Sequence, residues 1–206
     1  MKGRSFGRPF FWLHLSLSEG DADLVAENRV QPVQVDFVGT TLICLGSSYY
    51  HVFPSNETLL LDRWVSVFAF MAFFCIILGE YLAPIIGIRL LLPTIVFGLV
   101  TVIYWAISEA LGWGDLRPYA IARFLPVLLI PLIVLMFRSR FLSDWYIWPI
   151  VASHFIARVL ENQDSSILAS LNWVSGHSLS HVAAAAGPLF FLFALLKRIP
   201  VNAERN

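Results

Sequence analysis

Long apolar stretches, each close to the length of a membrane-spanning helix, follow one another along most of the 206-residue chain. An α-helix needs roughly 20 mostly apolar residues to cross a bilayer. Short segments rich in Pro, Gly, Asn and charged residues separate the stretches and are typical of turns. The pattern therefore predicts an all-α polytopic membrane protein with six transmembrane helices, over about residues 33–53, 58–80, 89–110, 119–137, 144–161 and 174–196.

The composition supports a membrane protein. Hydrophobic residues make up 58% of the chain and charged residues only 14%, whereas about a quarter of a soluble domain is charged. The formal net charge is zero, which argues against a nucleic-acid-binding protein. We expect the partner to be a membrane lipid, and no obligate protein partner is evident.

Residues 1–32 do not fit the transmembrane pattern. The apolar run "FFWLHLSL" at 10–17 is too short to span a bilayer. Basic residues before it and an acidic segment after it allow three interpretations: a signal peptide, a flexible tail or a degenerate first helix. We expect a transmembrane helical domain at 33–196 and a short C-terminal tail at 197–206.

The distribution of basic residues predicts the orientation. Cytoplasmic loops of membrane proteins carry an excess of Lys and Arg. Numbering the predicted helices in order places the C-terminus on the side with more basic residues, so we expect it to be cytoplasmic. That side holds Arg89, Arg138, Arg140, Lys197, Arg198 and Arg205, and the other holds Arg63, Arg117, Arg123 and Arg158.

Two histidines begin the last predicted helix, in "SGHSLSHVAAAAG". His177 and His181 are four residues apart, so on a helix they lie on one face, one turn above the other. Two imidazoles in that arrangement can bind one metal ion. The spacing also arises by chance, and two separately packed histidines are the alternative for this pair taken alone.

Three further polar residues are expected at the same depth. Ser47 and His51 share a face near the end of the first predicted helix, and Asp62 lies early in the second. Alternating helix directions bring these helix ends and the start of the last helix to the same side of the membrane. Polar side chains at membrane depth are costly and usually functional. In the alternative interpretation, each polar group is satisfied separately by a neighbouring helix.

This set of residue types suits a catalytic metal site. Three neutral imidazoles leave one position open on tetrahedral zinc, and water in that position has its pKa lowered to about 7. A carboxylate such as Asp62 can orient that water or accept its proton, and the Ser47 hydroxyl can donate to a developing oxyanion. Nitrogen ligands favour zinc over magnesium or calcium, and copper and iron remain compatible.

Three blocks of the sequence resemble a known group of membrane proteins. "SSYYH", "LLLDRW" and "HSLSH" are similar to the signature blocks of the CREST superfamily, which includes alkaline ceramidases and adiponectin-type receptors. The resemblance covers about residues 37–196. It is strongest to bacterial members of the alkaline ceramidase branch, which share a "GS-x-YYH-x-x-P-x-N" stretch and a "GDLRPY" loop.

The resemblance implies a seven-helix bundle in a bacterial inner membrane, with zinc bound by His51, His177 and His181. It implies that Ser47 and Asp62 act beside the metal in hydrolysing an amide, or a related ester, of a ceramide-like lipid. The chain departs from the family at its N-terminus, where the first helix and the acidic calcium-binding block are not recognisable. A calcium site is therefore in doubt.

Two other classes of protein are compatible with these residues. A receptor or lipid-binding membrane protein could keep zinc without catalysis. A transporter could relay protons through buried His and Asp residues, although a relay requires ionisable groups at several depths, whereas these gather at one.

Overall fold

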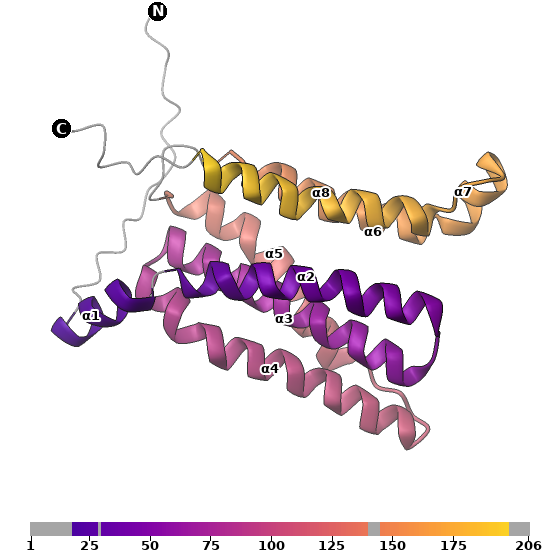
Figure 1. Cartoon of the computed structure of the whole chain (residues 1–206), viewed down its shortest axis with the longest axis horizontal. Helices are drawn as coiled ribbons and strands as arrows, with labels where there is room; N and C mark the ends of the chain where they lie inside the picture. Colours follow the sequence, from indigo (N-terminus) through magenta and orange to yellow (C-terminus); the bar gives the residue numbers. More distant parts are fainter. Residues whose placement is uncertain (1–17, 29, 140–144, 198–206) are drawn as a thin grey trace, which may run out of the picture. The chain divides into compact units, whose positions relative to one another are not determined.

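The computed structural model describes residues 18–28, 30–139 and 145–197, and its helices confirm the predicted all-α class (Figure 1). Four of them are long and apolar enough to cross a membrane: α3, α4, α5 and α8. The helices are α1 (Glu19–Asn28), α2 (Gln31–Val52), α3 (Asn56–Tyr81), α4 (Pro84–Ala110), α5 (Arg117–Met136), α6 (Ile147–Asn162), α7 (Asp164–Leu171) and α8 (Gly176–Leu196).

Each of the six predicted transmembrane segments is a helix in the structure, with ends that differ by a few residues. The largest difference is at α4, which begins at Pro84 rather than at residue 89, because proline is well suited to the first turn of a helix. Two of the six, α2 and α6, are not among the four helices long and apolar enough to cross a membrane. Helix α6 has only 16 residues, and α2 is the more polar of these two. Membrane crossing by α2 and α6 stays a prediction.

Two short helices were not predicted. The sequence between the predicted helices 144–161 and 174–196 was expected to be a connection, but only Gln163 interrupts the helical conformation after α6, and α7 begins at Asp164. Helix α1 forms within the N-terminal segment and is about 15 Å long at 1.5 Å per residue, half the thickness of a bilayer core. The apolar run 10–17 lies outside the described residues.

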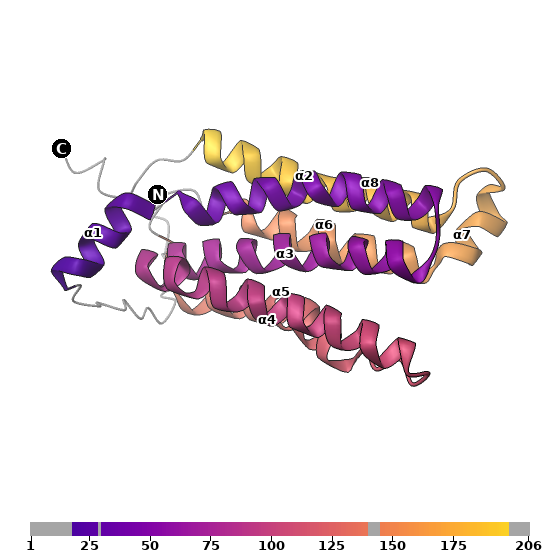
Figure 2. The same cartoon turned by 60° about the horizontal axis from the view of Figure 1, so that its bottom comes forward.

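The chain divides into two compact units, residues 1–138 and 139–206. In the first unit, α3 contacts α2, α4 and α5, and Figures 1 and 2 both show α2 and α4 running alongside it. In the second unit, α8 packs along α6, and α7 lies where the chain turns from one to the other.

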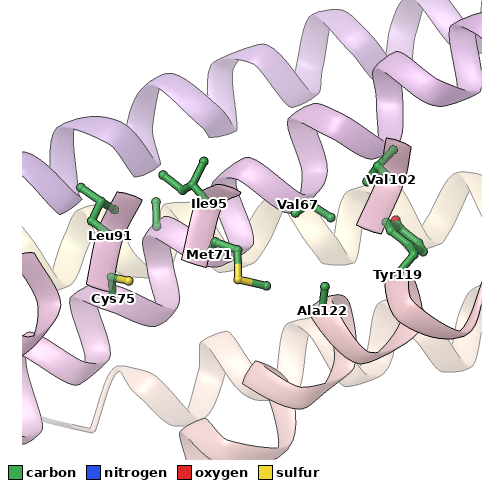
Figure 3. Packing of buried hydrophobic residues seen from close by; sticks show 9 residues of the cluster. Val67, Met71, Cys75, Leu91, Ile95, Val102, Tyr119 and Ala122 are labelled. Carbon is green, nitrogen blue, oxygen red and sulfur yellow. The ribbon is translucent and has the colours of Figure 1, made fainter. Parts of the chain in front are cut away.

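The core of the first unit is built from α3, α4 and α5. Val67, Met71 and Cys75 lie on one face of α3, spaced by four residues, and are almost fully buried. Leu91, Ile95 and Val102 of α4 and Tyr119 and Ala122 of α5 complete the cluster (Figure 3). Burial of this apolar face holds α3 in register with its neighbours.

Glycines allow α2 to approach α3 closely. A Cβ on Gly39 would lie 2.9 Å from Ala69 Cα, and one on Gly46 would lie 2.8 Å from Val65 Cγ2. These glycines are seven residues apart and therefore on one face of α2. Small residues at a helix interface let two backbones pack tightly in a membrane.

Candidate metal centre

The two histidines of α8 form a close pair. His177 Nε2 and His181 Nε2 are 3.2 Å apart, and the two rings meet edge to face with centroids separated by 4.8 Å. Their spacing of four residues on a continuous helix produces this arrangement. The His177 side chain is half-buried and that of His181 is exposed.

The separation of these nitrogens suits one metal ion. Two ligands at roughly 2.0–2.1 Å from a tetrahedral zinc are about 3.3 Å apart. The observed 3.2 Å between the Nε2 atoms is close to that value. Neutral imidazole nitrogens are also the donors that zinc, copper and iron accept. The pair therefore fits two positions of a metal site, and its donors do not identify the metal.

The start of α8 is fixed by two caps. Ser175 is the N-cap residue, and its hydroxyl accepts a hydrogen bond from the Ser178 backbone N–H at 3.1 Å. The Asp164 carboxylate, at the start of α7, accepts a hydrogen bond from the His177 backbone N–H at 2.7 Å. This bond to the His177 N–H lowers the pKa of the Asp164 carboxyl group. The helix turn that carries His177 is thus held by α7.

Close packing supports the same turn. A Cβ on Gly176 would lie 2.3 Å from the Leu160 carbonyl oxygen and 2.8 Å from Asp164 Cα. Only glycine fits there without a shift of backbone atoms. Gly176 therefore lets α8 begin directly against the end of α6, one residue before the first histidine.

Ser47 and His51 lie on the last turns of α2, and Asp62 lies on the second turn of α3. Ser47 and Asp62 are half-buried and His51 is exposed. A Cβ on Gly46, the neighbour of Ser47, would lie 3.7 Å from Asp62 Cα. Within the first unit, the structure therefore packs the turn that carries Ser47 against the turn that carries Asp62.

A tight connection joins these two helices. Residues 53–55 separate α2 from α3, and Ser55 and Thr58 form a reciprocal capping box at the start of α3. The Thr58 hydroxyl also donates to the carbonyl oxygen of Phe53, the C-cap residue of α2, at 2.6 Å. These bonds hold the end of α2, which carries His51, next to the start of α3.

His177 and His181, two of the three metal ligands that the sequence predicted, lie together in the second unit. His51 lies in the first unit, and its part in the same metal site stays a prediction. The catalytic roles of Ser47 and Asp62 remain predictions.

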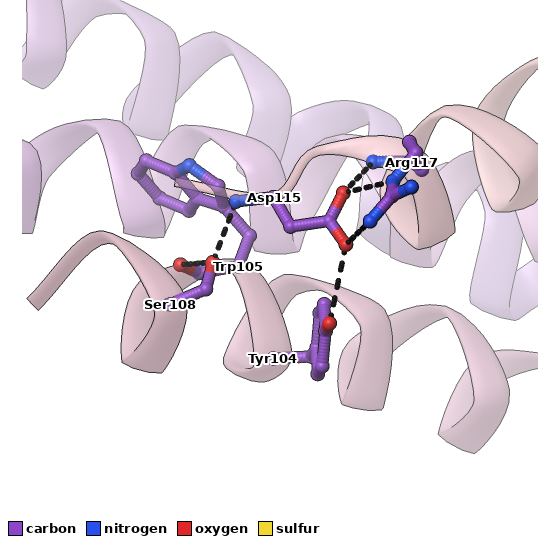
Figure 4. Close-up of polar contacts among 5 residues, drawn as sticks. All are labelled: Tyr104, Trp105, Ser108, Asp115 and Arg117. Atoms are coloured by element: carbon purple, nitrogen blue, oxygen red, sulfur yellow. Dashed lines mark hydrogen bonds and ion pairs between the residues drawn. The ribbon is translucent and has the colours of Figure 1, made fainter. Parts of the chain in front are cut away.

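The "GDLRPY" loop is a structural connection between α4 and α5. The Asp115 carboxylate accepts hydrogen bonds from the backbone N–H and side chain of Arg117 and from the Tyr104 hydroxyl (Figure 4). The Asp115 backbone N–H donates to the hydroxyl of fully buried Ser108 at 2.8 Å. These bonds to Arg117 strongly lower the pKa of the Asp115 carboxyl group.

Sequence reasoning missed Asp164 and the packing role of Gly46. A glycine followed by Ser47 in an apolar helix was a usable signal for close packing. Asp164 had no such signal, because its partner is the backbone of a residue 13 positions later.

No family model, curated protein or solved structure matches this chain.

Proposed function

We propose that this protein is a membrane hydrolase that uses a zinc ion to cleave an amide or ester bond of a ceramide-like lipid. The observation that carries the proposal is the 3.2 Å separation of His177 Nε2 and His181 Nε2, which suits two ligands of one metal ion. The motif resemblance supports the reaction class. The four helices long enough to cross a membrane support a lipid substrate.

In this proposal, His51, His177 and His181 hold the zinc. Bound zinc supplies Lewis acidity and makes a water molecule acidic enough to be deprotonated near neutral pH. The Asp62 carboxylate orients that water and accepts its proton. The Ser47 hydroxyl donates to the carbonyl oxygen as negative charge develops on it.

The packing of α2 on α3 supports these two roles. The contact at Gly46 places Ser47 and Asp62 on adjoining turns of a rigid pair of helices. Both side chains are half-buried, and partial exclusion of water strengthens their electrostatic interactions with a reacting group. The proposal therefore draws its hydroxyl donor and its carboxylate acceptor from neighbouring turns of α2 and α3.

Metal analysis of the purified protein and turnover of a panel of N-acyl and O-acyl lipids test the proposal. We expect about one zinc per chain, and we expect the double variant His177→Ala/His181→Ala to lose both metal and turnover. His154→Ala is the matched control, because His154 lies on α6 outside the three-histidine group.

Two results would contradict the proposal in different ways. Full metal occupancy in the double variant would exclude this pair as ligands. A zinc-loaded protein that turns over no lipid in the panel would instead favour the non-catalytic receptor.

A further inference from the structure

Two arginines of the first unit contact the same aromatic side chain. Arg63 on α3 places its guanidinium carbon 3.8 Å from the ring centre of Trp105 and 5.3 Å from that of Tyr119. Arg123 on α5 donates a 2.8 Å hydrogen bond from Nη1 to the Tyr119 hydroxyl. Trp105 and Tyr119 are buried, so packing holds both rings in place. The two guanidinium groups are therefore positioned beside one tyrosine.

Each arginine has one buried donor that is left unpaired in the part of the chain that the structure describes. Arg63 Nη1 and Arg123 Nε have no hydrogen-bond partner among the described residues. Arg89, Arg117 and Arg158 form ion pairs with carboxylates, whereas Arg63 interacts electrostatically with the neighbouring Asp62. A guanidinium is permanently charged and carries five N–H donors, and a buried donor without an acceptor is unfavourable.

The rings stabilise positive charge but leave the N–H edges available. A cation over an aromatic face is attracted by the ring quadrupole, and this contact uses the flat face of Arg63 rather than its donors. Two cations near each other in a poorly solvated place also repel. An anion with several acceptor oxygens would satisfy both the charge and the donors.

The position of the pair indicates what the anion belongs to. Arg63 is seven residues beyond the start of α3 and Arg123 is six beyond the start of α5, or about 10 Å along each helix at 1.5 Å per residue. Both helices are long and apolar enough to cross a membrane. For a helix that begins at the membrane surface, this distance corresponds to the boundary between lipid headgroups and acyl chains.

We propose that Arg63 and Arg123 bind the phosphate group of a membrane lipid. A carboxylate has two oxygens and is filled by one bidentate arginine, whereas a phosphate has further oxygens for a second guanidinium. Arginine is the residue that matches such oxyanions in planar, paired geometry. The proposal extends beyond the hydrolase and does not depend on its metal, because lipid binding is measured without turnover.

Native mass spectrometry of the full-length protein in detergent tests this site, with dioleoyl phosphatidic acid and dioleoylglycerol as probes. The two lipids share their acyl chains and differ in the phosphate. We expect phosphatidic acid to bind at least about tenfold more tightly, and we expect Arg63→Gln and Arg123→Gln each to remove most of that preference. Arg63→Lys keeps the charge without the paired donors and should lose part of it.

Arg117→Gln is the matched control, because Arg117 lies on the same helix as Arg123 but is already paired with Asp115. It should keep the preference. Equal binding of both lipids by the wild type, or an equal loss in Arg117→Gln, would overturn the site. Inorganic phosphate that binds as tightly as phosphatidic acid would overturn its assignment to a lipid. Where Arg63→Gln fails to fold, Arg63→Lys and Arg123→Gln decide the outcome.

Discussion

At the scale of single residues, the proposed function assigns metal binding and substrate chemistry to different side chains. Imidazole nitrogens are at the spacing of metal ligands in α8, whereas Ser47 and Asp62 come from α2 and α3. In the proposed site, three histidines supply the zinc ligands, so neither the hydroxyl nor the carboxylate is needed to hold the metal. The proposed mechanism therefore predicts that metal binding and catalysis can be separated by mutation.

Asp62→Asn is expected to retain zinc and lose lipid hydrolysis, because the amide cannot accept a proton from the attacking water. Ser47→Ala is expected to retain zinc and to lower turnover by about 10²–10³, the effect of removing one oxyanion donor. Metal content and turnover of the same preparations measure both effects. Wild-type turnover in Ser47→Ala would limit Ser47 to packing, and loss of zinc in Asp62→Asn would make Asp62 a ligand.

Contacts between residues of one regular helix could be predicted from the sequence, because they depend on spacing alone. Contacts between residues of different helices could not. The pairing of His177 with His181 depends only on their spacing of four. The bond from the His177 N–H to Asp164 depends on how the chain folds back between α6 and α8. The same limit applies to Arg63 and Arg123, whose shared tyrosine became visible only when α3 and α5 were placed together.

At the scale of helices, the first unit depends on close contact between α2 and α3. The buried residues of α2 are Pro32, Asp36, Gly39 and Gly46, and the two glycines bring its backbone against α3. The structure shows that small residues, rather than hydrophobicity, define its packing face.

Gly39→Val is expected to destabilise the protein by about 1–3 kcal/mol, the usual effect of overpacking a tight contact. The added Cβ would lie 2.9 Å from backbone Cα of Ala69, which cannot rotate away. Thermal unfolding in detergent measures the change. Gly20→Ala is the control, because nothing lies within 4 Å of a Cβ at Gly20; an equal loss of stability in that variant would show that the contact with α3 is not the cause.

The loop between α4 and α5 should make stability depend on pH. Bonds from Arg117 lower the pKa of the Asp115 carboxyl group below its usual value of about 3.9. A lowered pKa stabilises the folded state above that value, and the contribution is lost as the pH falls through the folded-state pKa. We therefore expect the difference in Tm between wild type and Asp115→Asn to be constant from pH 5 to 8 and to shrink below about pH 4. A difference that grows on acidification would contradict the ion pair.

At the scale of the whole molecule, the number of helices that cross the membrane decides on which side of it each helix end lies. Each of the six predicted segments is a helix in the described part of the chain, but their lengths and polarities differ. Hydropathy alone selects α3, α4, α5 and α8. Sequence could predict the six longer helices, because apolar stretches and turn residues are local properties, but it did not predict the short helices α1 and α7. Whether α2 and α6 cross depends on their neighbours, which can cover polar side chains in the membrane.

The predicted orientation places three helix ends on one side of the membrane: those that carry His51, Asp62 and His177. Basic residues are more frequent on the side of the C-terminus, so the candidate centre should lie toward the non-cytoplasmic leaflet. A lipid amide lies near the headgroup level, and a shallow site can reach it without drawing the headgroup into hydrocarbon.

Single cysteines at Trp113, between α4 and α5, and at Arg140, after α5, test this orientation in a protein without Cys44 and Cys75. Trp113 is exposed, and the two positions flank α5, a helix long and apolar enough to cross a membrane. We expect a membrane-impermeant thiol reagent to label the cysteine at 113 in intact cells and to label the one at 140 only after the cells are opened. The reverse pattern would place the end of the molecule that carries His51 and Asp62 in the cytoplasm, and the lipid would then have to reach the site from the inner leaflet. Labelling of both positions in intact cells would mean that α5 does not cross, and the alternation of helices that brings Ser47, Asp62 and the histidines to one side would fail with it.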